Sequence, residues 1–199
     1  SVRSESVRGP GAGRDGENAW FGVIKVIIRS AGKVHGAEVS GSYGEFKAYH
    51  GRVTFGKAFT KGMELLLSGT LYNSEGAENL FYPQFNTPAQ NNGVSHNLDG
   101  HAFHSFFGSF SYHDFKLEGS FIERKKENPT AQFGTTFNDP HLRTIDDRGY
   151  ANLSYTHSFE NVVDLTAQLY YDRTSYQIVY PQDPILFKEQ QQGDWWGTE

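Results

Sequence analysis

The segment FKLEGSF (residues 115–121) alternates apolar or small side chains with polar ones. The apolar or small positions are Phe115, Leu117, Gly119 and Phe121, and the polar positions are Lys116, Glu118 and Ser120. Successive side chains of a β-strand point to opposite faces, so this pattern predicts a strand with one apolar face. The alternation recurs in other segments, most of them about ten residues long: 37–44, 52–59, 63–72, 102–112, 151–159 and 163–172. The chain is therefore predicted to be all-β.

The composition supports strands and excludes several functional classes. Aromatic residues make up 15% of the 199 residues and glycine occurs 22 times, a combination that favours strands over helices. The formal net charge of -5 provides no basic excess, so we expect no nucleic-acid partner. Because the chain has no cysteine, disulfides and thiolate metal sites are excluded. No run in the sequence approaches the roughly 18 apolar residues of a membrane-spanning helix.

The connections between the predicted strands alternate between short and long. The short ones are 60–62, 113–114 and 160–161, and the long polar ones are 73–100, about 127–148 and about 173–193. Outer-membrane barrels show this alternation, because their periplasmic turns are short and their extracellular loops are long. We therefore predict an antiparallel transmembrane β-barrel, of which this chain forms about seven or eight strands.

The two faces of the predicted strands differ in chemistry. Leu65, Leu117 and Leu165 represent the apolar face, and Glu64, Glu118 and Asp164 represent the polar face. A Lys or Arg that faces lipid at the bilayer midplane costs roughly 2–4 kcal/mol. We therefore expect the apolar face to contact lipid and the polar face to line a water-filled lumen. Alternation alone does not decide which face is outward, and a soluble antiparallel β-sheet protein is an alternative.

The N-terminal glycines Gly11, Gly13 and Gly16 match the pattern G-x-G-x-x-G, which in other proteins binds a dinucleotide. That site requires the glycines to open a helix within a βαβ unit. Here the strand-like residues 20–28 follow, and the antiparallel segments come after them. We interpret the glycines as a turn and predict no nucleotide cofactor.

The same stretch has a second set of motifs. Arg8-Gly9-Pro10, Gly16-Glu17-Asn18-Ala19 and Gly22-Val23-Ile24 all lie within residues 7–29. In this order they resemble the end of the plug domain of TonB-dependent outer-membrane receptors, in which the barrel begins directly afterwards. The segment GDWWGTE (193–199) resembles a barrel strand of the same family.

The resemblance implies a fragment of a larger protein. Residues 1–32 would be the C-terminal end of the plug domain, and residues 33–199 would be the N-terminal part of a barrel of about 22 strands. It implies uptake of a scarce nutrient, such as a ferric siderophore or cobalamin, across the outer membrane of a Gram-negative bacterium. The implied partners are TonB with its inner-membrane energising complex, the ligand and outer-membrane lipid.

No motif of covalent catalysis is present, so we expect no enzymatic activity and no cofactor. One alternative function is a self-contained eight-stranded outer-membrane barrel that acts as a structural anchor or adhesin. A soluble ligand-binding β-barrel is the other.

The loop NLFYPQFNTPAQNN (79–92) combines aromatic residues with amides and prolines. Large ligands are held by such stacking and hydrogen bonding, so this region is the candidate ligand site. Its candidate residues are Phe81, Tyr82, Phe85, Asn91, Asn92 and His96. An aromatic girdle at the membrane interface with a rigid loop is the other interpretation. From the family resemblance, Arg8 is the candidate plug–barrel contact, with a solvated arginine as the alternative.

Two groups of residues suggest a metal, but we predict no metal site. His101 and His104 are three positions apart, so on one strand they point to opposite faces and cannot easily share an ion. Asp139, Asp146 and Asp147 provide oxygen ligands that suit Ca²⁺. We interpret them as a solvated acidic loop.

Overall fold

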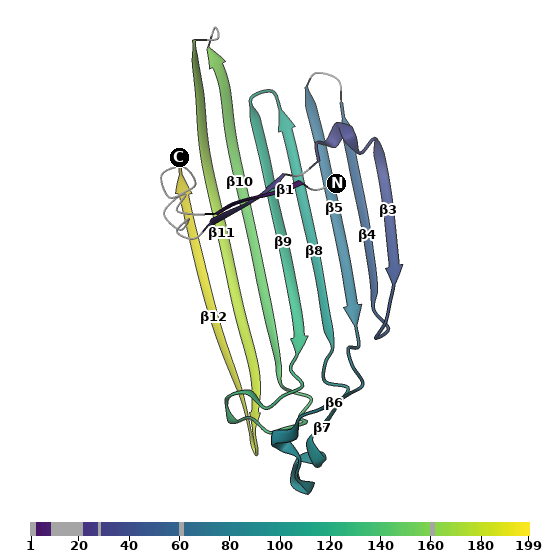
Figure 1. The fold of residues 1–199 in the computed structure, drawn as a ribbon. Helices are drawn as coiled ribbons and strands as arrows, with labels where there is room; N and C mark the ends of the chain where they lie inside the picture. Colours follow the sequence, from purple (N-terminus) through teal and green to yellow (C-terminus); the bar gives the residue numbers. More distant parts are fainter. Residues whose placement is uncertain (1–2, 9–21, 28, 60–61, 160–161) are drawn as a thin grey trace.

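The computed structural model describes residues 3–8, 22–27, 29–59, 62–159 and 162–199, the first two ranges by their backbone alone. Its main element is one antiparallel sheet of eight strands (Figure 1). Along the sheet the strand order is β12-β11-β10-β9-β8-β5-β4-β3, so strands that follow one another in this sheet are always neighbours. The expectation of an all-β, antiparallel chain is confirmed.

Seven of the eight strands of the sheet overlap the alternating segments of the sequence. They are β3 (Gly36–Tyr43), β4 (Tyr49–Ala58), β5 (Met63–Ser74), β8 (His101–Tyr112), β9 (Phe115–Glu127), β10 (Arg143–Phe159), β11 (Val163–Gln182) and β12 (Ile185–Thr198). The turn at 113–114 is as short as expected. The expected turns at 60–62 and 160–161 lie partly or wholly outside the described residues.

One connection differs from the expectation. We expected a long loop over about 173–193, but β11 continues to Gln182 and β12 starts at Ile185, so only two residues connect them. The reason is local: residues 174–180 (TSYQIVY) are rich in β-branched and aromatic side chains, which favour a strand even where the alternation of polarity is lost. β12 is therefore a full strand and not the start of one.

Smaller elements lie outside the sheet. β1 (Arg3–Arg8) and β2 (Gly22–Ile27) form an antiparallel hairpin, and β6 (Asn79–Phe81) pairs with β7 (Val94–His96). The 3-10 segments are η1 (Ala31–Lys33), η2 (Pro83–Phe85), η3 (Pro88–Gly93) and η4 (Gln132–Gly134). None of these helical segments in the described part of the chain is long and apolar enough to cross a bilayer. The expected domain boundary at 32/33 falls within η1.

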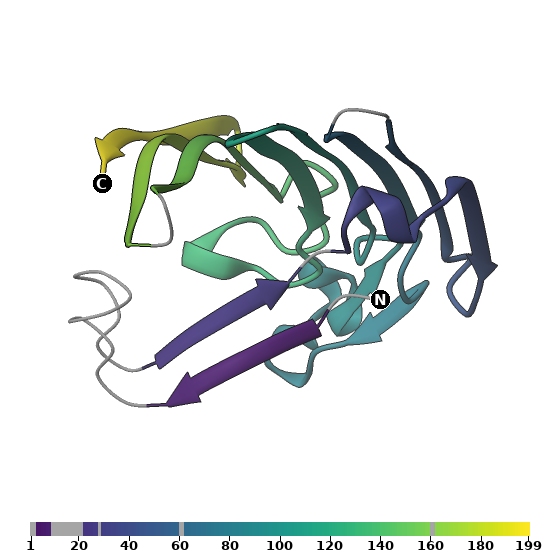
Figure 2. The same cartoon turned by 90° about the horizontal axis from the view of Figure 1, so that it is seen from above.

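The sheet is curved, and η1 identifies its two faces. Figure 2 shows the eight strands as an arc, with η1 and the β1–β2 hairpin on the concave side. Ala31 and Val34, in and beside η1, form a small apolar core with Leu66 of β5, and Phe107 of β8 packs against it. Leu66 and Phe107 therefore face the concave side, and their neighbours along each strand face the convex side.

The convex face carries most of the apolar side chains of the sheet. One row across five strands consists of Leu65, Phe110, Leu117, Leu153 and Leu169, each paired with the next. The next row toward the short turn at 113–114 points to the concave side and consists of Glu64, Ser111, Lys116, Ser154 and Gln168. Leu117, Leu153 and Leu169 are 40–50% exposed. The apolar face of the sheet is thus an open surface, which is unusual for a protein in water.

Candidate functional site

The two long loops emerge from the same end of the sheet and pack against each other (Figure 1). The loop between β5 and β8 spans residues 75–100, and the loop between β9 and β10 spans residues 128–142. Phe137 of the second loop is buried, and its ring stacks on Phe85 at a centroid distance of 4.5 Å. The rings of Phe137 and Tyr82 meet edge to face, with their centroids 6.0 Å apart. An aromatic contact of this kind adds about 0.5–1.5 kcal/mol to the burial of the rings.

The 128–142 loop also contacts the β11–β12 hairpin. The backbone N–H of Thr136 donates to the Pro181 carbonyl at 2.9 Å. In return, the Thr136 hydroxyl accepts a hydrogen bond from the N–H of Asp183 at 3.3 Å. This loop therefore links the 75–100 loop to the β11–β12 turn, and the loop end of the sheet is one connected structure.

The structure places the predicted ligand residues in three different situations. Tyr82 and Phe85 are half-buried against Phe137, so they hold the two loops together. Phe81 and His96 are exposed, and the His96 N–H donates to Asn138 Oδ1 at 2.9 Å. Sequence reasoning missed Phe137. Its only signal was an apolar residue isolated in a polar loop.

Asn91 and Asn92 have a backbone role. Both are left-handed, with φ of 49° and 50°. Asparagine tolerates this region better than other residues with a side chain, because its amide bonds locally. The amide of Asn91 does so, donating to the Val94 carbonyl at 2.7 Å. The side chain of Arg8, the predicted plug–barrel contact, lies outside what the structure describes.

Asp99 fixes the base of the 75–100 loop. Its carboxylate accepts a hydrogen bond from the Ala77 N–H at 3.1 Å and pairs with the ammonium of Lys126, which also donates to the Asp99 carbonyl at 2.8 Å. Burial alone would raise the pKa of Asp99. The hydrogen bonds from Lys126 and Ala77 outweigh burial, so the pKa lies below its ordinary value.

His101 lies on the concave face at the loop end of β8. Arg124 Nε donates to His101 Nε2 at 3.0 Å, an arrangement that needs a neutral imidazole. Burial lowers the pKa of His101, and the positive charges of Arg124 and Lys126 lower it further. His104 faces the convex side, directly opposite Glu123 on the neighbouring strand. The expectation that the two histidines point to opposite faces is confirmed.

The three aspartates considered for Ca²⁺ do not converge. Asp146 faces the concave side, 3.8 Å from Arg124, and its neighbour Asp147 faces the convex side opposite Ser175. Asp139 accepts hydrogen bonds from the backbone and ring of His141, both at 2.8 Å. Within the described part of the chain, no group of three or more His, Asp or Glu side chains is placed to hold a metal ion.

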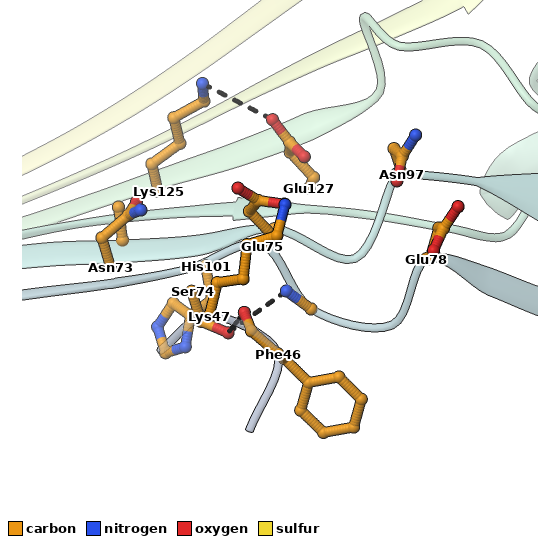
Figure 3. A pocket seen from close by; sticks show the side chains of 13 residues that line it. Phe46, Lys47, Asn73, Ser74, Glu75, Glu78, Asn97, His101, Lys125 and Glu127 are labelled. Atoms are coloured by element: carbon orange, nitrogen blue, oxygen red, sulfur yellow. Dashed lines mark hydrogen bonds and ion pairs between the residues drawn. The ribbon is translucent and has the colours of Figure 1, made fainter. Parts of the chain in front are cut away.

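A polar pocket of about 760 Å³ lies at the loop end of β5, β8 and β9, and the sequence did not predict it (Figure 3). Phe46 and Lys47 of the β3–β4 turn line one part of it. Lys47 pairs with Glu75 at 2.5 Å, and Lys125 lies 3.7 Å from Glu127. Its other lining groups include Asn73, Glu78, Asn97 and His101.

Comparison with known proteins assigns no family to the chain. No protein-family model matches the sequence, and no curated protein matches it significantly.

Proposed function

We propose that the chain is part of a TonB-dependent outer-membrane receptor, which takes up a scarce nutrient such as a ferric siderophore or cobalamin. The observation that carries this proposal is the apolar convex face of an open, curved sheet. Full burial of such a side chain is worth about 1.5–3 kcal/mol, and the half-exposed leucines and phenylalanines of this face would gain roughly half of that on removal from water. A lipid bilayer provides such an environment over the whole face at once.

The height of the apolar surface matches a bilayer. On β10 the convex positions from Gly149 to Phe159 are free of acidic and permanently cationic side chains. A tilted membrane-spanning strand needs about 9–11 residues. Toward the loops, the convex face then becomes polar at a row formed by His104, Glu123 and Asp147. In the proposed orientation this row marks the boundary with the headgroups and the long loops face the exterior.

The concave face has the chemistry of a water-filled wall. Arg148 makes a two-point ion pair with Asp172, with the closest atoms 2.6 Å apart. Lys116 pairs with Glu118 at 2.5 Å on the same face. Such pairs are tolerated where water reaches them and are costly in lipid.

The shape of the sheet supports a wall larger than eight strands. The strand order puts β3 and β12 at opposite edges, and Figure 2 shows an arc with the β1–β2 hairpin on its concave side. A plug segment inside a wide barrel would occupy this position. The eight-strand count also fits the alternative, a self-contained anchor or adhesin, but that protein would require β3 to pair with β12.

The test uses the complete protein in cells with and without TonB. Cells are given a panel of iron-55 siderophores and cobalt-57 cobalamin, and surface binding and uptake are measured separately. We expect one probe to bind in both strains and to accumulate only when TonB is present. Binding with TonB-independent accumulation, or loss of the protein from the outer-membrane fraction, would contradict the proposal.

A further inference from the structure

The pocket at the loop end is lined in part by side chains of the convex face. Asn73, Ala102 and Lys125 line it and form one row across β5, β8 and β9. This row faces the same side as Leu71, which lies two residues before Asn73 and is 62% exposed. Ser74 and His101, which are opposite each other in the sheet and face the concave side, also line the pocket, so it lies across the loop end of the strands. On its convex side, the pocket thus continues the sheet surface beyond the polar edge of the apolar region.

The lining combines a flat ring with hydrogen-bonding groups of both kinds. Phe46 is 56% exposed. Asn73 and Asn97 provide amides that both donate and accept, and Glu78 provides an acceptor. Both lysines of the pocket already have a carboxylate close by, so the site carries little net charge (Figure 3). A ligand with many hydroxyl groups and one apolar ring face fits this chemistry better than a multiply charged one.

The ring is presented by a strained turn. Phe46 and Lys47 are consecutive left-handed residues, with φ of 57° and 53°. Bulky residues rarely adopt this conformation, and it persists only where contacts impose it. Here the Phe46 carbonyl accepts hydrogen bonds from the Glu75 N–H at 3.1 Å and from the Ser74 hydroxyl at 3.3 Å. The turn is therefore fixed to the end of β5, and the pocket wall is preorganised.

We propose that this pocket binds the sugar headgroup of a membrane glycolipid. The lipid would place its acyl chains on the convex apolar surface beside Leu71, and its sugar would stack on Phe46 and bond to Asn73, Asn97 and Glu78. This inference rests on the proposed membrane location of the convex face. It adds a site at the level where headgroups lie.

The test reconstitutes the complete protein into phosphatidylcholine nanodiscs that contain a minor fraction of diglucosyl diacylglycerol. Native mass spectrometry then measures which lipid stays bound after release. We expect retention of the glycolipid over phosphatidylcholine. Phe46→Leu should reduce this preference about fivefold, because the flat ring is lost. Glu78→Gln should reduce it about tenfold, because one charge-assisted hydrogen bond is lost.

Two matched variants control for general effects. Phe133→Ala removes an aromatic residue that is 76% exposed and does not line the pocket. Lys188→Gln removes a lysine that does not line the pocket. It lies on the convex face, in the same cross-strand row as Val179, Arg143 and Glu127. Both should keep the wild-type preference.

Three outcomes would overturn the inference. In the first, the protein enters nanodiscs, but the wild type shows no preference for the glycolipid, or both pocket variants show the same preference as the wild type. The proposed function then stands and the inference alone fails. In the second, free maltose at the same concentration displaces the glycolipid completely, which makes the pocket a site for soluble sugar. In the third, the protein does not enter nanodiscs, and the membrane location fails together with the inference.

Discussion

Leu66 and Leu67 are consecutive leucines of β5 that lie on opposite faces of the sheet. Leu66 is 5% exposed and packs in the core beside η1, whereas Leu67 is 36% exposed on the convex face. On the concave face, η1 covers Leu66 and buries it. The convex face leaves its apolar side chains open along five strands. This difference leads to predictions on stability that separate the two faces.

A charged side chain introduced on the convex face should destabilise the protein, and one introduced on the concave face should not. Leu153→Arg places a cation in the apolar row and should destabilise the membrane-embedded protein by about 2–4 kcal/mol. Thr156→Arg, three residues along on the concave face of β10, should have little effect. Urea unfolding of the complete protein in vesicles measures both. Equal losses in the two variants would contradict the assigned faces.

Gly56 permits the contact between η1 and β4. A methyl group at this position would lie 2.6 Å from Val34 Cβ and 2.8 Å from the Ala31 carbonyl oxygen. Gly56→Ala should therefore lower the free energy of unfolding by about 1–3 kcal/mol through overpacking. Gly51, on the same strand, has no atom within 4 Å of the added group, so Gly51→Ala is the control and should not destabilise the protein. A thermal unfolding series compares the two, and similar melting temperatures would contradict the packing described.

Phe137 should hold the two long loops together. Truncation of a buried phenylalanine costs about 3–5 kcal/mol, and here the loss falls on the loops and not on the sheet. Phe137→Ala should therefore increase hydrogen exchange in residues 79–96 and 132–142 while the sheet stays protected. Phe133→Ala, on the same loop but exposed, should leave exchange unchanged. If exchange stays at the wild-type level in Phe137→Ala, the loops are held by other contacts.

The base of the 75–100 loop should weaken in mild acid. The pKa of His101 is lowered from 6.5 in the folded protein, by burial first and then by Arg124 and Lys126. The neutral imidazole is thus favoured by folding. The contribution of His101 to the free energy of unfolding is complete above pH 6.5 and is lost as the pH falls through the lowered pKa of the folded protein.

Unfolding measured between pH 7.5 and 5 should therefore show a loss of stability that His101→Gln removes. His104→Gln, on the opposite face of β8, should retain the loss. A pH dependence that persists in His101→Gln would show that another group controls it.

The strands were predictable because their signal is local. Alternation in segments such as 115–121 follows from the two-residue period of a strand, and it located seven of the strands. It failed at the second half of β11, where Ile178 and Val179 are adjacent and both buried, and at β12. Intrinsic strand propensity was the stronger signal there.

The loop contacts were not predictable because they join residues far apart in the chain. Phe137 meets Phe85, and Phe46 meets Ser74, only after the sheet has brought their strands together. The aromatic residues of 79–92 were recognised as important. The sequence alone did not show that two of them pack against another loop.

The most direct test of the central claim is a measurement of what each face of the sheet contacts. Residues 1–199 contain no cysteine, so a cysteine introduced at Leu153 or at Thr156 provides the one spin-labelling site within this part of the complete protein in vesicles. Power-saturation electron paramagnetic resonance then compares collisions with oxygen, which concentrates in lipid, and with a water-soluble nickel chelate. If the convex face contacts lipid, the label at position 153 collides mainly with oxygen and the label at 156 mainly with nickel. The reverse pattern, or equal access to nickel at both positions, would contradict it.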